Sequence, residues 1–196
     1  MPDGLTPAQT SRSTYTVAAL QGLVTVATFA AVGALCGLLW FHLWQVPPGV
    51  VSDGEWFTDE TGLRGDFAGT GLYVAIAALA GLVLGALAAW FLDRAELVTL
   101  VAVAAGSVLA AYLMLRVGYH LSPPDPQVVA RTAEDGARVD GALRVHQWPP
   151  RLAFPFGALV GLVAVYSLTG GRTPPGWTGA AASGTPDGTH GEAPGV

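Results

Sequence analysis

The feature that most constrains the fold is a pair of charge-free segments separated by only four residues. The segments Phe67–Leu92 and Leu97–Leu115 contain no charged residue, and the tetrapeptide Asp93–Glu96 joins them. Each segment is long enough to cross the hydrocarbon core of a bilayer, which needs ~20 apolar residues in a helix. Because four residues leave room only for a tight turn, we expect two antiparallel, adjacent helices inside a membrane.

Two further apolar segments flank this pair. Val17–Trp44 is charge-free over 28 residues, which is too long for a signal-peptide core of ~7–15 residues. Leu152–Gly171 lies between two arginines. The sequence therefore predicts an all-α membrane protein, a bundle of four transmembrane helices at about residues 17–44, 70–92, 97–118 and 152–171.

The composition agrees with this fold class. Charged residues make up 12% of the chain, against roughly 25% in soluble domains. The net charge of −5 gives no basic footprint for nucleic acid. The single cysteine, Cys36, excludes an intramolecular disulfide. We expect residues 1–16 to be flexible and the Gly/Pro-rich tail, residues 172–196, to be disordered, because such a composition cannot bury a core.

The two longer loops carry local structural signals. In the acidic first loop, Glu55–Thr58 and Leu63–Phe67 flank residues 59–62, which predicts a small β-hairpin. In the second loop, Asp125 and Pro126 favour the start of a short surface helix over 126–135. Residues 142–147 are expected to form a strand.

Four crossings place both termini on one side of the membrane. We expect the termini to be cytoplasmic and the two longer loops to be extracytoplasmic, in a bacterial plasma membrane. The distribution of arginines does not favour this orientation by the positive-inside rule. The preference depends instead on the length of the outer loops and on the short Arg-bearing turn, Asp93–Glu96.

Several side chains are candidates for positions at the membrane boundary. Trp40 and Trp44 are four residues apart near the end of the first helix, where an aromatic belt is expected. Trp90 would mark an interface of the second helix. Arg116 would extend its charged group to the headgroups at the end of the third helix.

Each predicted helix also carries small residues at a spacing of four. Small residues let helix backbones approach in lipid, where apolar burial alone does not drive association. We expect internal packing of the bundle, with an oligomer contact as the alternative. The glycines concerned are Gly33, Gly37, Gly81, Gly85, Gly106, Gly157 and Gly161.

Sites for chemistry are sparse. His42, His120 and His146 fall at or beyond the same membrane face and are weak candidates for a metal site, but they lack a tight ligand spacing such as H-E-x-x-H. Interfacial histidines are more simply polar side chains, so we expect no metal and no cofactor. No catalytic motif is present, and we expect the chain not to be an enzyme. No ionisable residue lies at the centre of a predicted helix, whereas proton relays and ion pathways normally need one.

Three short motifs at the ends of the apolar segments resemble those of a known family. They are the glycine-rich first helix ending in Trp40 before Pro47, then Gly65-Asp66-Phe67, and then Ala142-Leu143-Arg144-Val145 with Trp148-Pro149. Together they resemble an actinobacterial family of four-pass membrane proteins catalogued as a domain of unknown function, over roughly residues 17–168. The resemblance implies no established activity, although members can be labelled transport permeases.

These observations favour an accessory or scaffold component of the cell envelope. Its partners would be the lipid bilayer, other envelope membrane proteins or a second copy of the chain, with Asp66, Phe67 and Trp148 as loop contact residues. The alternative is a permease-like subunit of a transporter, which would need a polar cavity at mid-membrane or an oligomeric pore. A weaker alternative is a metal-handling protein, which requires His42, His120 and His146 to converge.

Overall fold

Four long apolar helices dominate the computed structural model. It describes residues 7–92, 96–145 and 147–169, with the side chains from residue 17 onward except those of 96 and 97. The helices are α1 (Pro7–Leu43), α2 (Glu60–Phe91), α3 (Glu96–Leu121) and α5 (Ala153–Thr169), the last preceded by the 3₁₀ turn η1 (Pro149–Leu152). Among the described residues, four helices are long and apolar enough to span a membrane. This confirms the prediction of four such helices.

The helices pack in two pairs. Within each pair the two helices run in the same direction and are not consecutive in the sequence. Helix α1 packs mainly against α3, and α2 packs mainly against α5. Gly33 lies against Ala110, and Gly37, one turn later, lies against Met114, so α1 and α3 run in the same direction. The expectation that α2 and α3 pack side by side is wrong, because these consecutive helices make only a minor contact.

Glycines explain this pairing. A Cβ atom on Gly33 would lie 2.5 Å from the Cα of Ala110, and one on Gly85 would lie 2.7 Å from the carbonyl carbon of Ala158. Such approach is open only to glycine and increases dispersion contacts between helices in lipid. A short turn fixes the ends of α2 and α3, but the glycine face of α2 is turned to α5. All seven predicted packing glycines lie at such contacts, six against backbone and Gly106 against the ring of Phe29.

Aromatic side chains join one helix pair to the other. Phe29 of α1 and Phe154 of α5 have ring centroids 6.2 Å apart, and Trp40 of α1 meets Tyr73 of α2 edge-on at 5.1 Å. All four side chains are buried. The centre of the bundle is therefore built from aromatic contacts between the pairs and glycine contacts within them.

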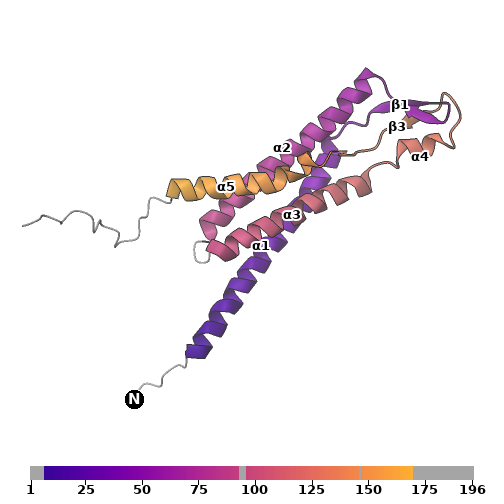
Figure 1. The fold of residues 1–196 in the computed structure, drawn as a ribbon. Coiled ribbons are helices and arrows are strands. Elements are labelled where there is room, and N and C mark those ends of the chain that lie inside the picture. Colours follow the sequence, from indigo (N-terminus) through magenta and orange to yellow (C-terminus); the bar gives the residue numbers. More distant parts are fainter. Residues whose placement is uncertain (1–6, 93–95, 146, 170–196) are drawn as a thin grey trace, which may run out of the picture.

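One end of the bundle carries a small folded unit, which we call the cap (residues 44–59 and 122–148, of which 146 is not described). The cap contains a three-stranded antiparallel sheet in the order β2-β1-β3 and the short helix α4. Figure 1 shows the cap at the opposite end from the first residues of α1 and the last residues of α5. The elements are β1 (Pro48–Ser52), β2 (Glu55–Phe57), α4 (Pro126–Ala130) and β3 (Arg138–Asp140).

The β-hairpin of the first loop lies earlier in the sequence than predicted. Asp53 and Gly54 have φ angles of 51° and 71° and connect β1 to β2, with Ser52 opposite Glu55. Positive φ at both central residues is the type I′ geometry that Asp-Gly favours in two-residue hairpins. Residues 59–62, predicted as the turn, begin α2 instead: the carboxylate of Asp59 accepts the Gly62 N–H at 2.9 Å as an N-cap.

Side-chain hydrogen bonds between the first and second loops complete the sheet. The indole N–H of Trp56 crosses β1 and donates to the carbonyl of Val139 at 2.9 Å. It passes over Gly49, where a Cβ would overlap the indole ring. The Gln127 amide of α4 accepts from the backbone N–H of Trp56 and donates to its carbonyl, at 3.3 and 3.1 Å. This pair of bonds satisfies the outer edge of β2, which would otherwise expose unpaired backbone groups.

Other boundaries also differ from the sequence prediction. Helix α1 begins at Pro7 rather than at residue 17, and α2 begins at Glu60 rather than at 70, so Gly65, Asp66 and Phe67 lie within it. The predicted helix 126–135 ends at Ala130, although Asp125 caps it as expected. The strand predicted at 142–147 is replaced by β3 at 138–140. The tail 172–196 lies outside the described residues.

Candidate site at the junction of the cap and the helices

A buried tryptophan organises the end of the bundle beneath the cap. Trp40 is fully buried, and its indole N–H donates to the carbonyl of Gly69 on α2 at 2.9 Å. A Cβ on Gly118 of α3 would lie 2.6 Å from the indole ring, so this glycine admits the side chain. A buried indole normally finds such a partner. The structure therefore places Trp40 in the core, and Trp44 is also buried, rather than in an aromatic belt facing lipid.

An extended segment of the second loop covers this tryptophan. Leu143 and Val145 are buried, whereas Arg144 between them is exposed. The Leu143 side chain lies close to both Gly69 and Gly118, between α2 and α3. This alternation closes the bundle with two apolar side chains and leaves the intervening charge at the surface.

Hydroxyl groups of α3 and its C-terminal end bind the backbone of this segment. The Ser122 hydroxyl accepts the Leu143 N–H at 2.7 Å, and the Tyr119 hydroxyl accepts the Val145 N–H at 2.9 Å. The guanidinium of Arg151 donates to the Val145 carbonyl at 3.0 Å. Among the described residues, residues 143–145 pair with no strand, so these side chains replace a ladder of backbone hydrogen bonds.

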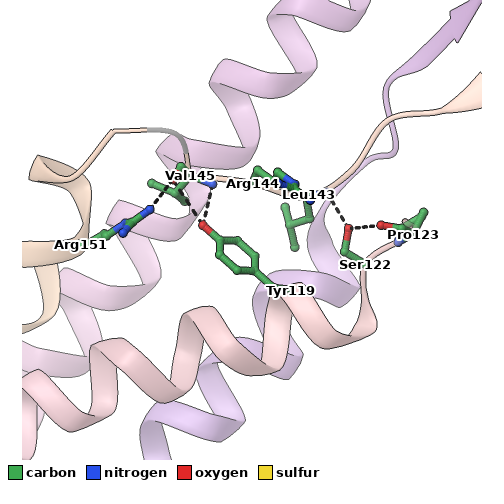
Figure 2. A pocket seen from close by; sticks show the side chains of 7 residues that line it. All are labelled: Tyr119, Ser122, Pro123, Leu143, Arg144, Val145 and Arg151. Atoms are coloured by element: carbon green, nitrogen blue, oxygen red, sulfur yellow. Dashed lines mark hydrogen bonds between the residues drawn. The ribbon is translucent and has the colours of Figure 1, made fainter. Parts of the chain in front are cut away.

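A cavity of about 310 Å³ opens where these groups meet, and we call it the junction pocket. Figure 2 shows its seven lining residues and the hydrogen bonds that join them. The side chains come from α3, from the loop that covers Trp40 and from η1. They are Tyr119, Ser122, Pro123, Leu143, Arg144, Val145 and Arg151.

Two arginines line the junction pocket, and none of its lining residues is acidic, although the whole chain has a net charge of −5. Arg144 is paired with Asp125 at 3.2 Å, and the other described salt bridge joins Arg64 to Glu60 in the first turns of α2. Within the described part of the chain, Arg151 therefore forms no salt bridge. Its only described hydrogen bond from the guanidinium is the one to the carbonyl of Val145.

A second, more open cavity adjoins the first. It has a volume of about 490 Å³ and shares Tyr119 with the junction pocket. We call it the α3 groove; its other lining residues are Leu38, Arg116, Val117, His120 and Leu121. The side chains of Arg116 and His120 in this lining are exposed.

Removing the Tyr119 hydroxyl tests whether its hydrogen bond with Val145 stabilises the segment that covers Trp40. Tyr119→Phe should leave the Val145 N–H without its partner and lower stability by ~1–3 kcal/mol, the usual cost of an unsatisfied buried donor. The measurement is thermal unfolding in mild detergent. Tyr112→Phe is the matched control, because Tyr112 is an exposed tyrosine on the same helix. Equal unfolding temperatures for the two variants would contradict the role assigned to Tyr119.

The other candidate residues are spread over the molecule. His42 and His120 are exposed, and His146 lies outside the described residues. Across the described chain, no group of three or more His, Cys, Asp or Glu side chains is placed to hold a metal. Phe67 and Trp148 are exposed, as is Trp90 at the far end of α2.

The residues of the junction pocket were not predicted from the sequence. The signal that could have identified them is the alternation Leu143-Arg144-Val145, because an apolar-polar-apolar triplet is typical of an extended segment with one buried face. The helix-end hydroxyls of Tyr119 and Ser122 give no comparable signal, since their partners are more than twenty residues away.

No protein-family model, curated protein or solved structure matches this chain.

Proposed function

We propose that this chain is a non-enzymatic accessory or scaffold protein of a bacterial cell envelope. One observation carries the proposal: the described threonine and serine side chains that are buried within the helices are bound to nearby backbone. Thr25, Thr99 and Ser107 donate to the carbonyls of Gln21, Leu92 and Ala104, at 2.9, 3.2 and 3.0 Å. Groups satisfied in this way are not available to a substrate, whereas transport pathways use ionisable or free polar groups at mid-membrane.

The grooves along the helices support the same assignment. One lies between α1 and α2 and is lined mainly by apolar side chains, with Thr25 and Thr28 as its polar members. Another lies between α1 and α3 and is lined by Ala, Gly, Leu and Val alone. Surfaces of this chemistry are suited to lipid tails or to another apolar helix.

The cap is the part that would contact other proteins. Phe57, Val128 and Trp148 are exposed apolar side chains on it, held on a sheet and helix that are tied together by hydrogen bonds of Trp56 and Gln127. We place the cap outside the cytoplasm and the termini inside, by the argument from loop length. Membership of the actinobacterial four-pass family is part of this proposal.

Photo-crosslinking in native membranes tests the scaffold function. A photoreactive amino acid at Phe57 or Val128 should give one defined protein adduct, because both side chains are exposed on the cap. The same group at Leu79, which is exposed on α2, should give lipid adducts only. Saturable solute uptake by proteoliposomes of the pure chain, with no protein adduct from the cap, would contradict the proposal and favour a permease.

A further inference from the structure

We propose that the junction pocket binds the phosphate of an anionic lipid from the adjoining leaflet. A lipid phosphate and free inorganic phosphate have the same chemistry for this site: an oxyanion bound by guanidinium groups. This site is independent of the scaffold function, because it requires only the bilayer as its partner.

The first argument is the supply of hydrogen-bond donors. A guanidinium has five N–H donors in a planar fork that matches phosphate. The described structure uses one group of Arg151, for the Val145 carbonyl at 3.0 Å, and one of Arg144, for Asp125 at 3.2 Å. Both side chains line the pocket (Figure 2) and retain further donors. The hydroxyls of Tyr119 and Ser122 are already engaged by the loop backbone, so the arginines would provide the recognition.

The second argument is an unpartnered hydroxyl in the core beside Trp40. The Tyr73 hydroxyl is buried and has no hydrogen-bond partner among the described groups. The ring of Trp40 contacts Tyr73 at 5.1 Å and Tyr119, which lines the junction pocket, at 6.2 Å. Buried polar groups are rarely left unpaired, so this hydroxyl indicates a site that is suited to a further polar group.

The third argument is the depth of the pocket. Tyr119 is in the last turn of α3, which ends at Leu121, and Arg151 is in η1, directly before α5. Both therefore lie where membrane-spanning helices leave the hydrocarbon core, which is the level of lipid phosphates. A guanidinium at this level is within reach of a lipid phosphate, which it binds through two parallel hydrogen bonds.

The α3 groove supplies a place for the rest of the lipid. It adjoins the junction pocket through Tyr119, and Leu38, Val117 and Leu121 give it an apolar wall. Arg116, which also lines the groove and is exposed, adds positive charge on the same side. Because both cavities are lined by Tyr119, one lipid could place its phosphate in the junction pocket and an acyl chain along the α3 groove.

Lipid titration of the full-length chain in mild detergent tests the proposal. Thermal stability is followed against a short-chain phosphatidylglycerol, a matched phosphatidylcholine and inorganic phosphate. We expect saturable stabilisation by phosphatidylglycerol, and Arg151→Gln should raise its half-saturating concentration by about tenfold or more, as loss of a charge-assisted contact predicts. Arg131→Gln is the control, because Arg131 is an exposed cap arginine that does not line the pocket.

A second variant separates binding from folding. Arg144→Gln leaves the Arg151–Val145 bond intact and should also weaken phosphatidylglycerol binding, by about threefold or more, without lowering the lipid-free unfolding temperature. Equal stabilisation by phosphatidylcholine, or unchanged half-saturation in both pocket variants, would overturn the proposal. Stabilisation by inorganic phosphate with the same dependence on Arg151 would assign the pocket to free phosphate and overturn the lipid assignment.

Discussion

Replacing Gly81 and Gly85 together with leucine should separate α5 from α2 and prevent the chain from purifying as a single species. A Cβ on Gly81 would lie 2.9 Å from the backbone nitrogen of Ala158, and one on Gly85 would lie at the same distance from the Cα of Ala158. Backbone cannot move aside as a flexible side chain does. We expect a loss of roughly 3 kcal/mol or more, the upper range for overpacked cores, measured by thermal unfolding and size-exclusion chromatography.

The matched control is Gly71→Leu with Ala75→Leu on the same helix. These two residues have the same spacing of four and are exposed, and a Cβ on Gly71 would meet no atom within 4 Å. This variant should elute and unfold like the parent protein. If both double variants behave alike, the contact between α2 and α5 does not depend on these glycines.

Trp40→Ala should give the second large effect. The side chain is fully buried between α1, α2 and α3, and its indole donates to the Gly69 carbonyl. Truncation of a core tryptophan costs ~3–5 kcal/mol in soluble proteins. Because lipid is itself apolar, the transfer part of this cost is reduced and the cavity part persists, so we expect ~2–3 kcal/mol by thermal unfolding.

Two further variants resolve what Trp40 contributes. Trp40→Phe should keep most of the packing and lose the indole hydrogen bond, at a cost of ~1 kcal/mol. Trp90→Ala removes an exposed tryptophan and should change stability by ~0.5 kcal/mol or less. A Trp40→Ala variant as stable as Trp90→Ala would show that Trp40 is not part of the core in solution.

The sequence was sufficient to predict the four apolar helices, but not to predict which helices pack against each other. Apolar length reports that a segment fits the bilayer, and four such segments are present. The short connection after Leu92 suggested that α2 and α3 pack together, yet a connection constrains only helix ends. The glycines decide the contacts, and a spacing of four marks a close-approach face without identifying the helix it meets. Gly81 and Ala110 both belong to rows of small residues spaced four apart. Gly81 contacts α5, whereas Ala110 contacts α1.

The first loop contains two sequence signals for a turn or a helix start, and each begins with an aspartate. Asp53-Gly54 is the favoured pair for a two-residue hairpin, and Asp59 followed by Glu60 is a strong helix start. The prediction placed the turn at the second of these positions, and every boundary around it shifted accordingly. The alternation at Leu143–Val145 marks only the covering segment; the junction pocket itself was not predicted, because Tyr119, Arg144 and Arg151 line one cavity only after the second loop folds back over Trp40.

The parallel pairing of α1 with α3 inside the membrane is tested most directly by disulfide formation. The Cβ position of Gly22 lies 3.9 Å from the Cβ of Ala102, within the ~3.5–4.5 Å range of disulfides. In a Cys36→Ala background, Gly22→Cys with Ala102→Cys should crosslink rapidly on mild oxidation of native membranes, and Gly22→Cys with Leu79→Cys should not. A crosslink between α1 and α2 at Leu79, with none between α1 and α3, would contradict the arrangement described here.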